Sequence, residues 1–151
     1  MNIEQLREEL KIDEGVKYEV YLDHLGLPTC GIGHLIKDTD PEHGLEVGTA
    51  ISEERVNELF DEDIKVTISE CEDLFGNFND LPEEAQLILA NMMFNMGKPR
   101  LSKFVNLRKN IEEKDFPSSA IEMHASKWRR QVPNRAGRLI ERMKEVIWHL
   151  N

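Results

Sequence analysis

The chain has 151 residues, a length typical of one domain with room for two small lobes. Apolar residues make up 40% of it and charged residues 32%, a composition that excludes disordered and collagen-like proteins. Its apolar runs fall short of the roughly 18 residues that a membrane span needs, and its first residues show no signal-peptide pattern. Cys30 and Cys71 are too few for a disulfide scaffold and lack the spacing of metal ligands. We therefore expect a globular protein without a metal or other cofactor.

Charge is distributed unevenly along the chain. Residues 1–97 contain 6 basic and 23 acidic residues, a net charge of −17. Residues 98–151 contain 13 basic and 6 acidic residues, a net charge of +7, so the whole chain carries −10. This asymmetry indicates two faces or lobes with different electrostatic partners, although one solvated acidic helix and one solvated basic helix explain it equally well.

The first third of the chain changes from a helical pattern to a strand pattern. Apolar residues at helical spacing predict a short helix over 3–13 that ends at Gly15. Alternation then predicts a strand over 18–22, and turn residues lead to a returning strand over 29–33. Residues 37–50 are rich in Gly, Pro, Asp and Thr, which predicts a loop or a weak third strand.

Helical periodicity returns in the second third. A helix of about six turns is predicted over residues 52–75, with Ser52 as its N-cap and acids in its first turn. Pro82 opens the next helix, because a missing N–H is tolerated there. The segment 85–96 is apolar nearly all round, which is typical of the central buried helix of a helical lobe. Shorter helices are predicted near 101–109, 117–126 and 134–149.

The order of these elements predicts an α+β fold made of one domain, 1–151. A small β-hairpin lobe (about 12–60) is joined by a linking helix (about 52–75) to a larger helical lobe (about 76–151 plus helix 3–13). The cleft between two such lobes is the default position for an active site.

Three polar residues stand where the periodicity breaks. Glu14 ends the first helix, Asp23 ends the first strand and Thr29 opens the second. Two carboxylates and a hydroxyl can hydrolyse a glycosidic bond, since one acid protonates the leaving oxygen while the other carboxylate handles water. In a chain with 29 acids, however, this spacing alone is better explained by a helix-end carboxylate and a turn aspartate.

Several separated blocks of sequence carry a resemblance to a known family. They are Asp13-Glu14-Gly15, Tyr21-Leu22-Asp23, Thr29-Cys30-Gly31-Ile32-Gly33-His34, Asn91-Met92-Met93-Phe94-Asn95-Met96-Gly97 and Ser126-Lys127-Trp128-Arg129-Arg130-Gln131-Val132-Pro133-Asn134-Arg135-Ala136. In this order they resemble the phage-type lysozymes of the T-even kind, glycoside hydrolase family 24. The resemblance covers nearly the whole chain and implies a lysozyme-like fold.

The resemblance also implies an activity. It predicts an endolysin that hydrolyses, with inversion, the β-1,4 bond between N-acetylmuramic acid and N-acetylglucosamine in bacterial peptidoglycan. Glu14 then corresponds to the general acid, and Asp23 and Thr29 correspond to the residues that hold and activate the attacking water. Inversion requires carboxyl groups roughly 6.5–9.5 Å apart, which leaves space for that water.

Supporting residues follow from the same resemblance. Arg135 corresponds to a buried arginine that pairs with the catalytic acid. Two pairs, Asp13 with Arg138 and His34 with Asp63, correspond to ion pairs that stabilise the fold.

Positions facing the sugar are less uniform. Leu35 and Phe94 fall where the family lines its sugar cleft, although Phe94 is equally well explained as a core residue. Leu107 and Glu122 depart from the family, because they replace polar residues that contact substrate there.

Other functions remain as alternatives. A lytic transglycosylase also uses a glutamate but needs no water-holding Asp23 and Thr29. A non-catalytic wall-binding module has no need of Glu14. Basic residues near Trp128 fit a nucleic-acid surface, yet a net charge of −10 argues against general phosphate affinity.

For the lysozyme, we expect a monomer acting on peptidoglycan glycan strands, without nucleic acid or stable membrane association. We expect synthesis in the host cytoplasm and release to the wall through a holin.

Overall fold

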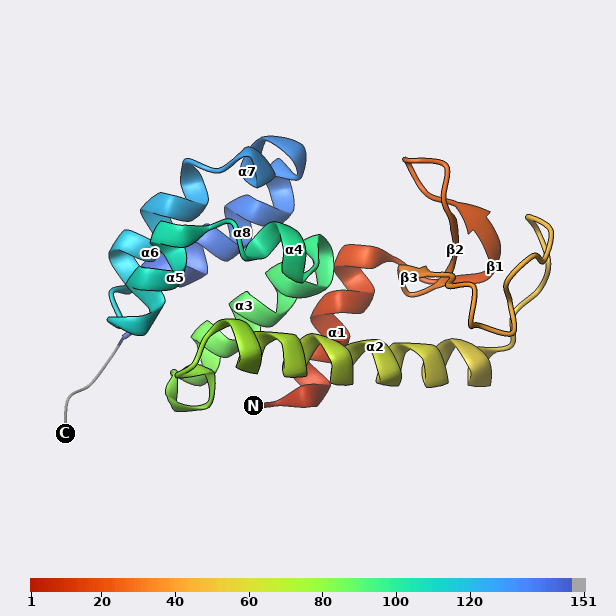
Figure 1. The fold of residues 1–151 in the computed structure, drawn as a ribbon, viewed down its shortest axis with the longest axis horizontal. Coiled ribbons are helices and arrows are strands. Elements are labelled where there is room, and N and C mark those ends of the chain that lie inside the picture. The colour runs from red at the N-terminus through yellow and green to blue at the C-terminus, as the bar shows by residue number, and fades with distance from the viewer. Residues whose placement is uncertain (148–151) are drawn as a thin grey trace. The chain divides into compact units, whose positions relative to one another are not determined.

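A computed structural model describes residues 1–147 of the chain (Figure 1). Within this range the predicted α+β class is confirmed, because helices flank a small antiparallel sheet. The first part comprises α1 (Ile3–Glu14), β1 (Lys17–Leu22), β2 (Pro28–Gly31), β3 (His34–Leu35) and α2 (Glu53–Leu74). The second comprises η1 (Phe78–Asp80), α3 (Glu83–Met96), α4 (Lys98–Leu101), α5 (Val105–Glu112), α6 (Phe116–His124), α7 (Lys127–Gln131) and α8 (Pro133–Lys144).

The chain divides into two compact units. One, which we call the hairpin unit, consists of residues 7–66; the other, the helical unit, consists of residues 1–6 together with the chain from Thr67 onward. Helices α1 and α2 each contribute residues to both units. In the described part of the chain, no helix is long and apolar enough to cross a membrane.

The sheet of the hairpin unit has the strand order β1-β2-β3 in the described residues. Tyr21 pairs with Thr29 across β1 and β2, and the register shifts between Lys17 and Tyr21. Most of residues 37–50 form a loop, one of the two structures predicted for them, and the third strand of the sheet, β3, precedes this loop and was not predicted. The end of the following loop pairs with β1 through an isolated bridge of Ala50 with Glu19 and through backbone hydrogen bonds to Tyr18 and Val20.

Helix α2 begins as the sequence predicted. The hydroxyl of Ser52 accepts a hydrogen bond from the backbone N–H of Arg55 at 3.1 Å, which caps the helix. On the turns that belong to the hairpin unit, one apolar stripe is buried: Val56, Leu59, Phe60 and Ile64. Burial of this stripe ties the helix to the sheet and the loop beside it.

The helical unit is built around α3, whose residues from Ala85 to Met93 are all buried. This agrees with the prediction of a central helix over 85–96. Two short helices, α4 and α7, lie between the longer helices that the sequence predicted. Helix α4 accommodates Pro99 in its first turn, where its missing N–H does no harm.

The last predicted helix is shorter than expected. Helix α8 ends at Lys144, with Glu145 as its C-cap. Positions 148 and 149 of the predicted helix lie outside the described residues.

Candidate active site in the hairpin unit

Glu14 is the last residue of α1, and its side chain lies directly against Gly33. A Cβ atom built on Gly33 would stand 2.9 Å from the Glu14 Oε1 atom and 3.3 Å from its Cδ atom. Gly33 also has a φ of +62°, a conformation that L side chains rarely adopt. Glycine at this position therefore leaves the space that the Glu14 carboxylate occupies.

Asp23 organises the turn between β1 and β2. Its Oδ1 atom accepts hydrogen bonds from the backbone N–H groups of Leu25 at 2.8 Å and Leu27 at 2.9 Å. The Leu27 bond, supported by the Leu25 bond, lowers the pKa of the Asp23 carboxyl, because donors to a carboxylate stabilise its charged form. Asp23 is therefore ionised at neutral pH, and its Oδ2 atom takes part in neither bond.

Thr29 is buried, with 4% of its surface exposed. Its hydroxyl donates to the carbonyl oxygen of Leu27 at 2.9 Å. Since a hydroxyl has one proton to donate, Oγ1 can act toward any further partner only as an acceptor. Asp23 and Thr29 thus both bond to Leu27, one at its N–H and the other at its carbonyl.

Tyr21 lies among these residues, although the sequence analysis gave it no role. It is half-buried on β1 and pairs directly with Thr29. Burial, followed by the negative charges of Glu14, Cys30 and Asp23, raises the pKa of its phenol. Tyr21 is therefore within electrostatic reach of both candidate carboxylates. Its position opposite Thr29 in a predicted hairpin is the signal that could have identified it.

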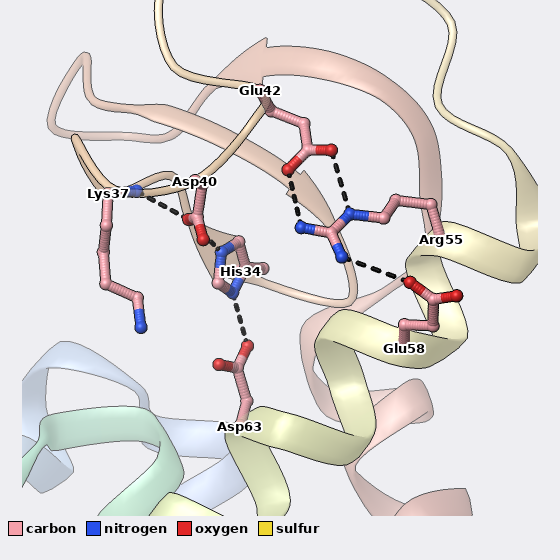
Figure 2. A network of polar contacts seen from close by, with 7 residues as sticks. All are labelled: His34, Lys37, Asp40, Glu42, Arg55, Glu58 and Asp63. Carbon is pink, nitrogen blue, oxygen red and sulfur yellow. Dashed lines mark hydrogen bonds and ion pairs between the residues drawn. The ribbon is translucent and has the colours of Figure 1, made fainter.

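His34 begins β3 next to this site and is held by two carboxylates (Figure 2). Its Nδ1 atom lies 2.6 Å from Asp63 Oδ2, and its Nε2 atom lies 2.7 Å from Asp40 Oδ2. Burial is the largest influence on the pKa of His34 and lowers it, but the bonds to Asp63 and Asp40 outweigh burial and raise it. The ion pair expected between His34 and Asp63 is present, whereas Asp40 was not expected.

A second ion pair fixes the loop that follows β3 (Figure 2). Arg55 of α2 donates from Nε and Nη2 to the two carboxylate oxygens of Glu42, at 2.9 and 3.1 Å. Its Nη1 atom donates to Glu58 at 3.2 Å. Glu42 is buried, and the hydrogen bonds from Arg55 lower its pKa. Together with the His34 contacts, this pair joins the loop over 36–52 to α2.

The remaining supporting residues are distributed over both units. Arg135 is buried on α8 and donates from Nε to Asn91 Oδ1 at 2.8 Å. Its expected pairing with Glu14 relates two units and stays a prediction. The same holds for Asp13, on the last turn of α1, and Arg138, exposed on α8.

The expected sugar-facing positions differ in exposure. Leu35 is half exposed on β3, and Phe94 is partly exposed on α3. In the helical unit, Leu107 and Glu122 line a groove of about 440 Å³ together with Trp128. The two positions expected to depart from the family therefore line the same groove.

Comparison with known proteins identifies the family. The family model of phage lysozyme matches residues 11–145. A probable T4-type lysozyme 2 of Dictyostelium discoideum is 37% identical, and the alignment covers 91% of this chain and 92% of that protein. A second protein of that organism, probable T4-type lysozyme 1, is 31% identical with the same coverage. An endolysin of Salmonella phage P22 is 28% identical over 74% of this chain and 73% of its own length. The chain therefore belongs to the phage lysozyme family, the hydrolases of bacterial peptidoglycan.

Proposed function

We propose that this lysozyme cleaves the β-1,4 bond between N-acetylmuramic acid and N-acetylglucosamine with inversion, using Glu14 as acid and Asp23 with Thr29 to hold water. One observation carries the proposal: Asp23 Oδ1 and the Thr29 hydroxyl proton are both committed to Leu27. What remains of the two side chains, Asp23 Oδ2 and the lone pairs of Thr29 Oγ1, can only accept hydrogen bonds.

Two acceptors on side chains that are both bonded to Leu27 suit a water molecule that has two hydrogens to donate. A water bonded through one hydrogen to Asp23 and through the other to Thr29 keeps a lone pair for the anomeric carbon. The lowered pKa of Asp23 keeps it ionised and able to receive a proton. Asp23 therefore acts as the base of the reaction, with Thr29 as the second anchor of the nucleophile.

The complete step balances without any further group. The water oxygen forms a bond to the anomeric carbon, and its proton passes to Asp23. The glycosidic C–O bond breaks on the opposite face, and Glu14 transfers its proton to the leaving oxygen. Direct attack by water inverts the anomeric configuration. Glu14 must carry its proton at the start of the step, because it acts as the general acid.

The likeness to the P22 endolysin supports a role in host lysis. In that role the substrate is the glycan strand of the bacterial wall, and one copy of the chain carries all three of Glu14, Asp23 and Thr29. A monomer is therefore sufficient.

Mass spectrometry of fragments released from purified peptidoglycan tests the proposal. The wild type should release disaccharide peptides with reducing N-acetylmuramic acid ends, and Glu14→Gln, whose amide keeps the shape but has no acid proton, should release none. Proton NMR of the first product should show the α-anomer if water attacks directly. Anhydro ends would reassign the protein as a lytic transglycosylase, and an active Glu14→Gln would remove the acid.

A further inference from the structure

We propose that Tyr21 is a positioning residue of this hydrolysis: its ring is a wall beside Thr29 that confines the attacking water to Asp23 and Thr29. The inference rests on the proposed function and adds a residue to it. Tyr21 acts through Thr29 and the water, without taking part in proton transfer.

The sheet register places the two side chains next to each other. Tyr21 and Thr29 are direct partners in the antiparallel pair of β1 and β2. Directly opposite residues share one face of a sheet, with Cβ atoms about 4.5–5.5 Å apart. Thr29 is buried and Tyr21 is only half-buried, so the ring extends from the covered hydroxyl toward the surface. In the proposal, this ring limits the access of bulk water to Thr29.

The ring is also held in place. The Nζ atom of Lys17, on the same strand, lies 4.3 Å from the centroid of the Tyr21 ring. A cation over an aromatic face is attracted to the ring, and this attraction restrains the rotation of the side chain. The Lys17 ammonium thus favours one orientation of the wall.

The electrostatic surroundings keep the wall uncharged. Burial is the main reason that the pKa of the Tyr21 phenol is raised, and the charges of Glu14 and Asp23 add to this effect. A neutral phenol does not repel the carboxylate that receives the proton from water. The hydrogen bonds that Asp23 accepts in the turn come from the backbone N–H groups of Leu25 and Leu27, and none of them comes from Tyr21.

Removing such a wall affects the rate more than substrate binding. A nucleophile misplaced by about 1 Å can cost on the order of 100-fold in rate. Tyr21→Ala admits additional water to Thr29, so the attacking molecule loses its fixed position. We expect kcat to fall by about 10- to 100-fold while KM stays within about twofold. Tyr21→Phe keeps the ring and restores kcat to within about twofold of the wild type.

Tyr18 provides a matched control on the same strand. It is half exposed, and its carbonyl accepts from Ile51, so its strand pairing is with the loop instead of with Thr29. Tyr18→Ala removes the same side chain and should leave both kinetic constants within about twofold. Thermal unfolding of all variants establishes that each is folded at the assay temperature.

A double-mutant cycle tests whether Tyr21 acts through Thr29. In a Thr29→Ala background, adding Tyr21→Ala should lower the residual rate by no more than about twofold, because the second anchor of the water is already gone. Fully additive losses, an effect confined to KM, or an unchanged kcat in Tyr21→Ala would each overturn the inference. Those results leave the proposed function intact if the wild type releases reducing ends; a wild type that releases none overturns both.

Discussion

Replacement of His34 by Asn tests the carboxylate–imidazolium–carboxylate contact beside the site. His34 is 4% exposed, and its partners Asp40 and Asp63 are 12% and 22% exposed. The substitution removes the cation and leaves two carboxylates facing each other. Removing one partner of a buried ion pair costs about 3–5 kcal/mol, and the partial exposure of Asp63 favours the lower figure. We expect a loss of about 3 kcal/mol, or about 6–12 °C in Tm for a chain of this length.

The pH dependence of that loss is specific to His34. Its pKa in the folded protein is raised above the ordinary value of 6.5. The stabilisation is therefore complete below about pH 6.5 and disappears as the pH rises through the raised pKa. The pKa of Asp40 is lowered from 3.8, so its contribution is present above about pH 3.8 and is lost as the pH falls further. Between these limits, near pH 5–6, both contributions are present.

Urea unfolding of the wild type and His34→Asn at pH 6 and pH 9.5 measures this difference. The gap between the two proteins should be about 3 kcal/mol at pH 6 and should shrink at pH 9.5, because the wild-type imidazole has then lost its charge. A difference below about 1 kcal/mol at pH 6, or one of equal size at both pH values, would refute the reasoning. The comparison between variants removes the effect of every other titrating group that they share.

Three further substitutions test other contacts of the hairpin unit. Gly33→Ala places a Cβ atom 2.9 Å from Glu14 Oε1 at a φ of +62°. We expect thermal unfolding to show a stability loss of about 1–2 kcal/mol. Release of reducing ends should be at least tenfold slower than in the wild type. Asp23→Asn keeps an acceptor for Leu25 and Leu27 but removes the base, so hydrolysis should fall by about 100-fold or more while Tm changes by only a few degrees; retained activity would exclude Asp23 as the base. Arg55→Met leaves the buried Glu42 without its bidentate partner, and chemical unfolding should show a loss of about 2–4 kcal/mol at pH 7. An unchanged unfolding midpoint would mean that the loop is held without this pair.

Periodicity predicted the long helices because each has several turns over which a pattern can repeat. Helices α1 and α2 were found in this way, with ends within one residue of those in the structure, whereas α3 was found from Pro82 and a segment that is apolar nearly all round. Helices α4 and α7 contain four and five residues and are too short to show a period. Strand β3 was not predicted because it has only two residues, and no alternation can be recognised over that length.

The candidate site was predictable in a different way. Glu14, Asp23 and Thr29 came from a resemblance of motifs, since their spacing alone was compatible with ordinary turn and helix-end roles. Asp40 and Glu42 were not predictable, because their contacts depend on the path of a loop with no periodic pattern. Asp40 and Glu42 reach their partners because the loop over 36–52 folds back against His34 on β3 and Arg55 on α2.

Asp23 can be both a turn residue of the hairpin and the base of the proposed reaction. As a turn residue it uses Oδ1 to accept the N–H groups of Leu25 and Leu27, and this fixes the path of the chain into β2. The same bonds lower the pKa of the carboxyl and orient it, leaving Oδ2 for a further partner. Thr29 then enters the strand with its proton already donated to Leu27, so its free capacity is also that of an acceptor. The bonds that close the hairpin thereby determine the charge and the acceptor geometry that the proposed water site requires.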